Sequence, residues 1–149
     1  MKKTFRGLLA NEETEKIRLS TNDGLTGYKI NKFQCIGADL FGSVSNEIVC
    51  KVFTTENDAT GVPRTATATV NFTDPTLAAV STFSSHDNAH IYPEDSIIIF
   101  DSMVFNQDVF ITMVNKQGGS GNYYLELEQV KLSKDEATVA TLKDMRASE

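Results

Sequence analysis

Alternating apolar and polar residues recur along most of the chain and predict short β-strands. In residues 28–36 and 48–53, apolar side chains occupy both parities, so we expect these two strands to be central and buried on both faces. In residues 65–72 the alternation is strict and predicts a strand with a solvated threonine face. Its core-facing side chains would be Ala66, Ala68, Val70 and Phe72.

Two further segments have less regular patterns. In residues 74–83, an aspartate followed by a proline predicts a short helical turn, whereas a strand through residues 80–83 is the competing interpretation. Residues 92–105 form an almost continuous apolar run that two polar residues interrupt at 101–102. This run predicts an interior strand that bends or bulges at the interruption.

The most regular pattern lies in residues 106–132, where two alternating segments flank the glycine-rich stretch "NKQGGSG". Glycine adopts positive φ without steric cost, so the stretch predicts the turn of a β-hairpin. On the return strand the apolar parity changes near Glu128 and Gln129. A β-bulge at these residues would keep the apolar side chains in the core.

Together these patterns predict an all-β protein with seven to nine short strands, no strand–helix–strand alternation and no internal repeat. An antiparallel β-sandwich, jelly-roll-like in topology, is the fold that we expect. The end of the chain differs, because Ser133 and Glu136 form a candidate capping box before a helical pattern. We therefore divide the chain into an N-terminal arm (1–14), the sandwich (15–132) and a C-terminal helix or arm (133–149).

Composition narrows the choice of partners. Fourteen basic and twenty acidic side chains give a net charge of −6, which argues against nucleic acid as a partner. The chain contains no apolar run of the length needed for a signal peptide or a membrane span, so we expect no membrane partner and a reducing cytoplasm at synthesis. In that compartment Cys35 and Cys50 are expected to be buried free thiols, and a disulfide is the alternative.

Candidate catalytic groups are sparse. His86 and His90 would share a face and bind a metal ion if their segment were helical, but the surrounding polar residues favour an exposed loop. Glu126 and Glu128 lie on one strand face at about 7 Å, a spacing compatible with acid/base chemistry and also typical of a solvated strand. We expect no metal, no cofactor and no enzymatic activity.

A carbohydrate platform would need exposed aromatic rings, and the chain has no tryptophan. Tyr123 and Tyr124 are adjacent on a predicted strand and point to opposite faces. We therefore expect one of them in the core and the other at the surface.

Several segments together resemble a family of small structural proteins of marine tailed bacteriophages. These segments are "KIRLSTNDGLTGYKINKFQCIG", "DPTLAAVSTFSSHDNA", "IIIFDSMVFNQDVFIT", "GNYYLELEQVKL" and "EATVATLKDMR", and the resemblance covers about residues 4 to 146. It implies a virion protein and supplies no catalytic residues.

The resemblance leads to one expectation and one alternative. We expect a capsid decoration or cement protein on the capsid surface, made in the host cytoplasm and bound to the major capsid protein. A homotrimer at threefold positions would match the lattice symmetry. The alternative is a head-fibre, tail or adhesion module that binds a host surface glycan.

Both arms carry apolar side chains that fall outside the strand pattern, and such side chains commonly contact a partner. The residues expected to make these contacts are Phe5, Arg6, Leu8, Leu9, Val139, Leu142, Met145 and Arg146. The alternative is that each arm folds back over its own sandwich.

Overall fold

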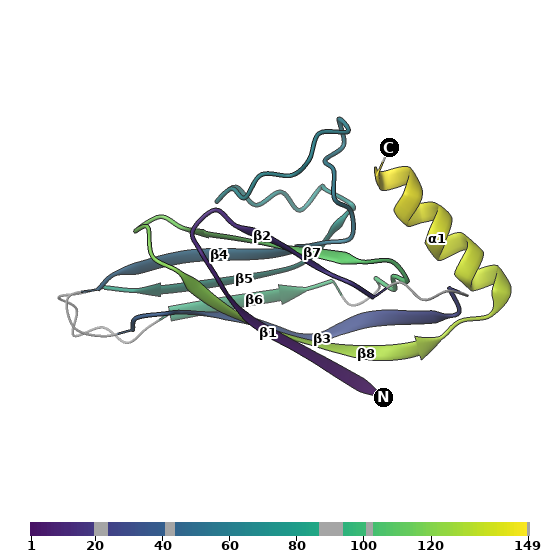
Figure 1. The fold of residues 1–149 in the computed structure, drawn as a ribbon, viewed down its shortest axis with the longest axis horizontal. Helices are drawn as coiled ribbons and strands as arrows, with labels where there is room; N and C mark the ends of the chain where they lie inside the picture. Colours follow the sequence, from purple (N-terminus) through teal and green to yellow (C-terminus); the bar gives the residue numbers. More distant parts are fainter. Residues whose placement is uncertain (20–23, 41–43, 87–93, 101–102, 149) are drawn as a thin grey trace.

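The chain folds into a sandwich of two antiparallel β-sheets followed by one helix (Figure 1). This computed structural model describes residues 1–19, 24–40, 44–86, 94–100 and 103–148. The elements are β1 (Lys2–Leu9), β2 (Thr14–Ile17), β3 (Thr26–Gly37), β4 (Asn46–Phe53), β5 (Leu77–Ser85), β6 (Glu94–Ile99), β7 (Val109–Asn115), β8 (Gly121–Lys131) and α1 (Lys134–Ser148). The predicted fold class, an antiparallel sandwich with a short C-terminal helix, is confirmed.

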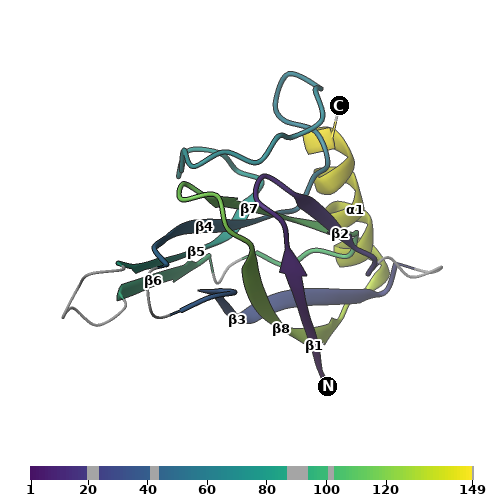
Figure 2. The ribbon, with the colours of Figure 1, turned by 60° about the vertical axis from the view of Figure 1, so that its left-hand side comes forward.

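The strand order matches that of a jelly roll except at β6, which a jelly roll would place beside β3. Sheet A has the order β1-β8-β3, and sheet B has the order β2-β7-β4-β5-β6. In an eight-stranded jelly roll the first, eighth and third strands share one sheet, and the second, seventh, fourth and fifth share the other. The chain follows this order, and β6 extends sheet B beside β5. Figure 2 shows the two sheets from the side, with α1 behind one end of the sandwich.

The core lies between the two sheets. Alternate residues of facing strands point inward and bury large apolar side chains. These include Phe33 and Leu125 of sheet A and Ile48, Val52, Ile111 and Met113 of sheet B. Such burial removes each side chain from water and stabilises the sandwich by about 1.5–3 kcal/mol per residue.

Residues 54–76 form a loop over the outer face of sheet B, here called the covering loop. The predicted strand at residues 65–72 is wrong: this segment forms no strand, and Val70 and Phe72 are exposed. The segment that carries the alternating residues is instead a loop that contacts a side chain of the sheet. The buried Lys51 donates from Nζ to Thr67 Oγ1 (3.2 Å) and to Thr69 O (2.7 Å), which holds the segment without a strand partner.

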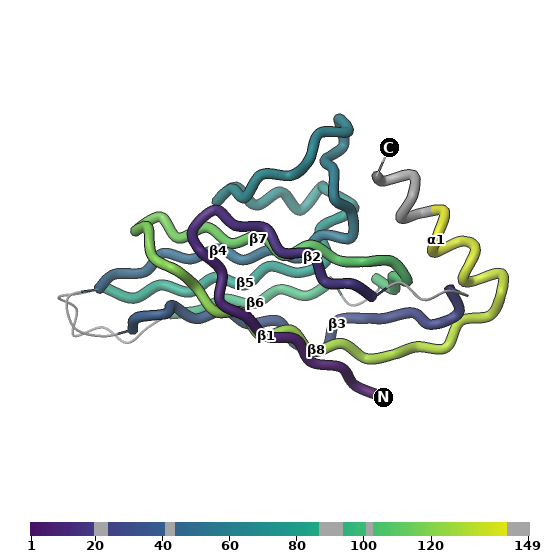
Figure 3. The backbone as a smooth tube through the Cα atoms, in the orientation of Figure 1, coloured from purple at the N-terminus to yellow at the C-terminus, as the bar shows by residue number. Residues whose placement is uncertain are grey.

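The predicted hairpin at 106–132 is also wrong, although both of its strands and its turn exist. Strand β7 belongs to sheet B and β8 to sheet A, so the chain crosses from one sheet to the other (Figure 3). Gly118 has a φ of 91°, and its amide donates to Asn115 O at 2.8 Å. All seven residues of β7 are buried, because the interior covers one face and other parts of the chain cover the second.

The expected bulge lies on a different strand. The register of β3 with β8 shifts between Ile30 and Lys32, so Asn31 is the extra residue. Because of this shift, both Ile30 and Phe33 are buried despite their opposite parities. Apolar residues on both parities had predicted a central strand, but among the described residues β3 lies at an edge of sheet A, which corrects that prediction.

The two less regular segments also form strands. At 74–83 the strand interpretation is confirmed as β5, and Asp74 accepts a hydrogen bond from the Thr76 amide (2.9 Å) in the preceding turn. Strand β6 is an exposed edge strand among the described residues, so the prediction of an interior strand is wrong. Its run of isoleucines resembles a buried strand, but only one of its two edges is paired. The predicted bend at 101–102 lies outside the described residues.

The N-terminal segment is part of the sandwich. Residues 2–9 form β1, which pairs along its whole length with β8, and β2 begins at Thr14. Leu9 is buried in the core, and the partly buried Phe5 packs against this core. The segment expected to be an arm, residues 1–14, therefore forms an edge strand and a turn. This matches the alternative expectation, in which the arm folds back on its own sandwich.

Candidate functional site

The outer face of sheet A is built of cross-strand rows that change in character along the sheet. The row at one end joins Lys2, Glu128 and Lys29, and the next joins Thr4, Glu126 and Lys32. Lys29 Nζ lies 3.1 Å from Glu128 Oε2, and Lys2 Nζ lies 3.7 Å from Glu126 Oε2. The two carboxylates considered as an acid/base pair are thus each matched by a lysine on an adjacent strand.

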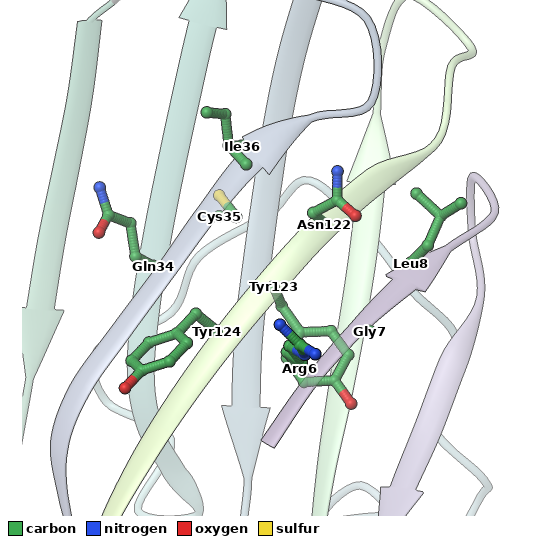
Figure 4. A pocket seen from close by; sticks show the side chains of 9 residues that line it. All are labelled: Arg6, Gly7, Leu8, Gln34, Cys35, Ile36, Asn122, Tyr123 and Tyr124. Carbon is green, nitrogen blue, oxygen red and sulfur yellow. The ribbon is translucent and has the colours of Figure 1, made fainter. Parts of the chain in front are cut away.

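The next two rows lack such pairing. One joins Arg6, Tyr124 and Gln34, and the other joins Leu8, Asn122 and Ile36. Figure 4 shows these side chains on one side of the sheet, with Asn122 between Leu8 and Ile36. They line a depression of about 570 Å³, here called the outer-face groove.

The side chains of the outer-face groove remain available to a ligand. Among the described residues, none donates to, accepts from or forms an ion pair with the side chains of Arg6, Gln34 or Asn122. Leu8 is 60% exposed and Ile36 is 42% exposed, although both are large and apolar. The groove thus combines one unpaired cation, two free amides and apolar side chains.

Two charged residues of the neighbouring row on the outer face contact the half-buried Tyr124 ring. Its hydroxyl lies 3.4 Å from Glu126 Oε1, and Lys32 Nζ lies 5.6 Å from the ring centroid. Both contacts favour one orientation of the ring. Tyr123 is buried, so the prediction of one core tyrosine and one surface tyrosine is confirmed.

Beneath the groove, the Tyr123 ring passes under Gly7 of β1. A Cβ on Gly7 would lie 2.9 Å from Tyr123 Cε1, so a larger residue would displace the ring. Burial, together with the nearby Glu15 carboxylate, raises the pKa of the Tyr123 hydroxyl. The phenol is therefore neutral at ordinary pH and supports β1 from below.

Of the four N-terminal residues predicted to bind a partner, the structure brings two to the surface. Arg6 and Leu8 are exposed in the outer-face groove, whereas Leu9 is in the core and Phe5 is half-buried. The sequence did not point to Gln34, Asn122 or Ile36 as members of this site. Their alternation places them on an outer face, but only the strand register brings them beside Arg6 and Leu8.

The C-terminal segment is a helix, and of its predicted capping box the N-cap at Ser133 is confirmed, whereas the Glu136 carboxylate meets the Ser133 hydroxyl in place of its backbone amide. The Glu136 amide donates to Ser133 Oγ (3.2 Å), and Ser133 Oγ donates to Glu136 Oε1 (3.1 Å). Asn106, which is fully buried, docks the helix on the sandwich: its Nδ2 donates to Ala137 O (3.3 Å) and Thr141 Oγ1 (2.7 Å).

On this docked helix two apolar residues are exposed, and one of them, Leu142, also lines a depression between the helix and residues 24–25. Val139 is 66% exposed and Leu142 is 45% exposed; they are here called the helix stripe. The side chains of Met145 and Arg146, which were predicted to extend the contact, lie outside the described part of the structure. A helix that exposes apolar side chains is suited to contact a partner.

The two cysteines lie in the core between the sheets and are free, as predicted. Cys35 Sγ accepts a hydrogen bond from Ser81 Oγ (3.3 Å) and lies 3.4 Å from Ser81 O. The pKa of the Cys50 thiol is raised, mainly by a hydrogen bond with Cys35 and to a lesser extent by burial. A protonated, buried thiol behaves as a small core residue.

The remaining candidate chemistry does not assemble into a site in the described structure. His86 is exposed and His90 lies outside the described residues, so the proposed histidine pair is untested. Within the described ranges, no three histidine, cysteine or acidic residues cluster as metal ligands would. In the same part of the chain, every helix is too short or too polar to cross a membrane.

Comparison with known proteins gives no family assignment: no family model matches the chain, and no significantly similar protein was found among curated proteins.

Proposed function

We propose that this protein is a non-enzymatic virion protein of a tailed bacteriophage, which decorates the capsid surface and binds the major capsid protein. The observation that carries the proposal is the helix stripe, Val139 and Leu142, presented on a docked helix after the sandwich has closed. The resemblance to structural proteins of marine phages supports the virion assignment. A jelly-roll sandwich supplies the rigid body that such a role requires.

The helix stripe is proposed to dock on the capsid lattice. Full burial of an exposed apolar side chain contributes about 1.5–3 kcal/mol, and because Val139 is 66% and Leu142 45% exposed in the free protein, docking would gain roughly half of that for each, before ordering costs. The ordering cost is small here, because Asn106 and the N-cap hold the helix in the free protein. Repetition around a threefold axis of the lattice would place three copies of the protein together, which is the basis for proposing a homotrimer.

The docking proposal is tested by replacing Leu142 with lysine and measuring co-sedimentation with capsids that lack the protein. The variant should fold normally, because Leu142 is 45% exposed, and its binding should fall by at least about tenfold. Ile98→Lys is the matched control: Ile98 is exposed to a similar degree, on β6, and its replacement should leave binding unchanged. Equal binding by the wild type and Leu142→Lys would contradict docking through the helix.

A further inference from the structure

The outer-face groove lies at the opposite end of β8 from α1. Asn122 is the second residue of β8, and α1 begins three residues after that strand ends. At about 3.3 Å per residue, some 30 Å separate the groove from the start of the helix. A molecule docked through the helix stripe would leave the groove open to other ligands. Binding at the groove is a property of the isolated protein and does not depend on the proposed function.

The charges on this face indicate what would bind. Toward one end, Lys2 and Lys29 already have carboxylate partners on β8. In the groove itself, Arg6 has no acidic partner among the described residues, and its row partners Tyr124 and Gln34 are uncharged. An unpaired guanidinium is matched best by a carboxylate, which it can bind through two parallel hydrogen bonds.

The remaining groups favour a sugar as the carrier of that carboxylate. The amides of Gln34 and Asn122 each offer donors and an acceptor, which suits neighbouring hydroxyl groups. The oriented Tyr124 ring and the exposed Leu8 and Ile36 side chains offer apolar surface for the C–H face of a pyranose. A volume of about 570 Å³ is within the range of small-ligand sites.

We propose that the outer-face groove binds an acidic saccharide: Arg6 pairs with the uronic carboxylate, Gln34 and Asn122 bind hydroxyl groups, and Tyr124 contacts the ring. An acidic peptide would share the contact with Arg6. A peptide is less well matched to the groove, because side chains on the face of the sheet line it. Strand β8, at the centre of the sheet, is already paired on both edges. Within the described part of sheet A, a peptide strand would find free backbone groups only at the outer edges of β1 and β3, where it would lie beside the groove and not across it.

The test is titration calorimetry of the purified protein with tetragalacturonate, with its methyl ester and with a tetra-aspartate peptide. Wild-type protein should bind the acid at least about tenfold more tightly than the ester, since the ester lacks the charge that Arg6 would bind. Arg6→Gln should abolish that preference, and Tyr124→Ala should weaken binding of both saccharides. Lys29→Gln removes the same charge from the same face outside the groove and should leave the preference intact.

Three results would overturn the proposal. One is the absence of binding of tetragalacturonate by a wild-type protein whose melting curve shows it to be folded. Another is equal loss of the preference in Arg6→Gln and Lys29→Gln, which would indicate a general effect of net charge. The third is tighter binding of the tetra-aspartate peptide than of the saccharide, which would assign the groove to an acidic peptide.

Discussion

At the scale of single residues, Arg64 shows how one buried cation organises a loop. Its guanidinium lies 3.9 Å from the centroid of the Phe53 ring and forms an ion pair with Asp74 (3.3 Å). The same group donates to Thr55 O and to the Thr76 hydroxyl. These contacts join both ends of the covering loop to the outer face of sheet B. The second apolar cluster of the molecule, which includes Phe53 and Phe110, lies on that face.

The Arg64–Asp74 contact makes the loop sensitive to acid. Burial alone would raise the pKa of Asp74, but hydrogen bonds from Thr76 and the charge of Arg64 together hold it below its ordinary value. A lowered carboxyl pKa contributes stability above the pKa of the unfolded chain, and the contribution is lost as the pH falls through the folded value. Asp74→Asn should therefore be less stable than wild type near neutral pH and closer to it at about pH 2.5. Urea unfolding at both pH values measures the difference, and an unchanged difference would argue against this role.

The turn between β7 and β8 requires positive φ at one glycine. Gly118 has a φ of 91° and open space around it, so an added Cβ would cost backbone strain alone, about 1–2 kcal/mol. Gly119 does not have a left-handed φ, and its Cβ would meet only the Asn115 amide at 3.2 Å. Gly118→Ala should therefore lower the free energy of unfolding more than Gly119→Ala. Chemical denaturation of the two variants decides this, and the reverse order would place the strain elsewhere.

At the scale of elements, the sequence predicted most strands correctly but not which strands pair. The alternation of β7 and β8 is regular, yet it carries no information on whether neighbouring strands belong to one sheet or two. In residues 65–72 the same alternation arises from contacts of a loop with Lys51. The bulge at Asn31 could not be located either, because a parity change is visible on both paired strands and only the register shows which one bulges.

The candidate site was predictable to the same limited extent. Arg6 and Leu8 were identified because they fall outside the predicted strands, although they turn out to lie on the exposed face of a strand. Their neighbours in the groove belong to β3 and β8, more than 25 residues away in sequence. The N-cap at Ser133 was predictable because its two partners are separated by only three residues.

The attachment of α1 depends on one buried side chain. Asn106 Nδ2 donates to Gly24 O as well as to Ala137 O and Thr141 Oγ1, so Asn106→Ala should release the helix while the sandwich remains folded. Amide hydrogen exchange should then show loss of protection in residues 134–148. Asn46→Ala is the matched control, because Asn46 is equally buried but contacts Asp39 and Ser85, in the sandwich. Loss of helix protection in both variants would indicate general destabilisation.

At the scale of the whole molecule, the two proposed binding surfaces lie at opposite ends of β8. Strand β8 leads directly to α1 (Figure 1). The helix stripe follows the C-terminal end of this strand, and the outer-face groove lies near its beginning. The sandwich between them is closed by a core of large apolar side chains and holds the two surfaces at a fixed separation. This arrangement suits a protein that binds a shell at one end and faces outward at the other.

The proposal that the protein covers the capsid lattice is tested by the number of copies in each particle. The measurement is quantitative mass spectrometry of purified particles of the phage proposed to carry the protein, with isotope-labelled peptides of this chain and of the major capsid protein as standards. Repeated docking on a closed lattice predicts on the order of hundreds of copies per particle, in a fixed ratio to the major capsid protein. A handful or a few dozen copies would contradict the claim and place the protein at a vertex, fibre or tail.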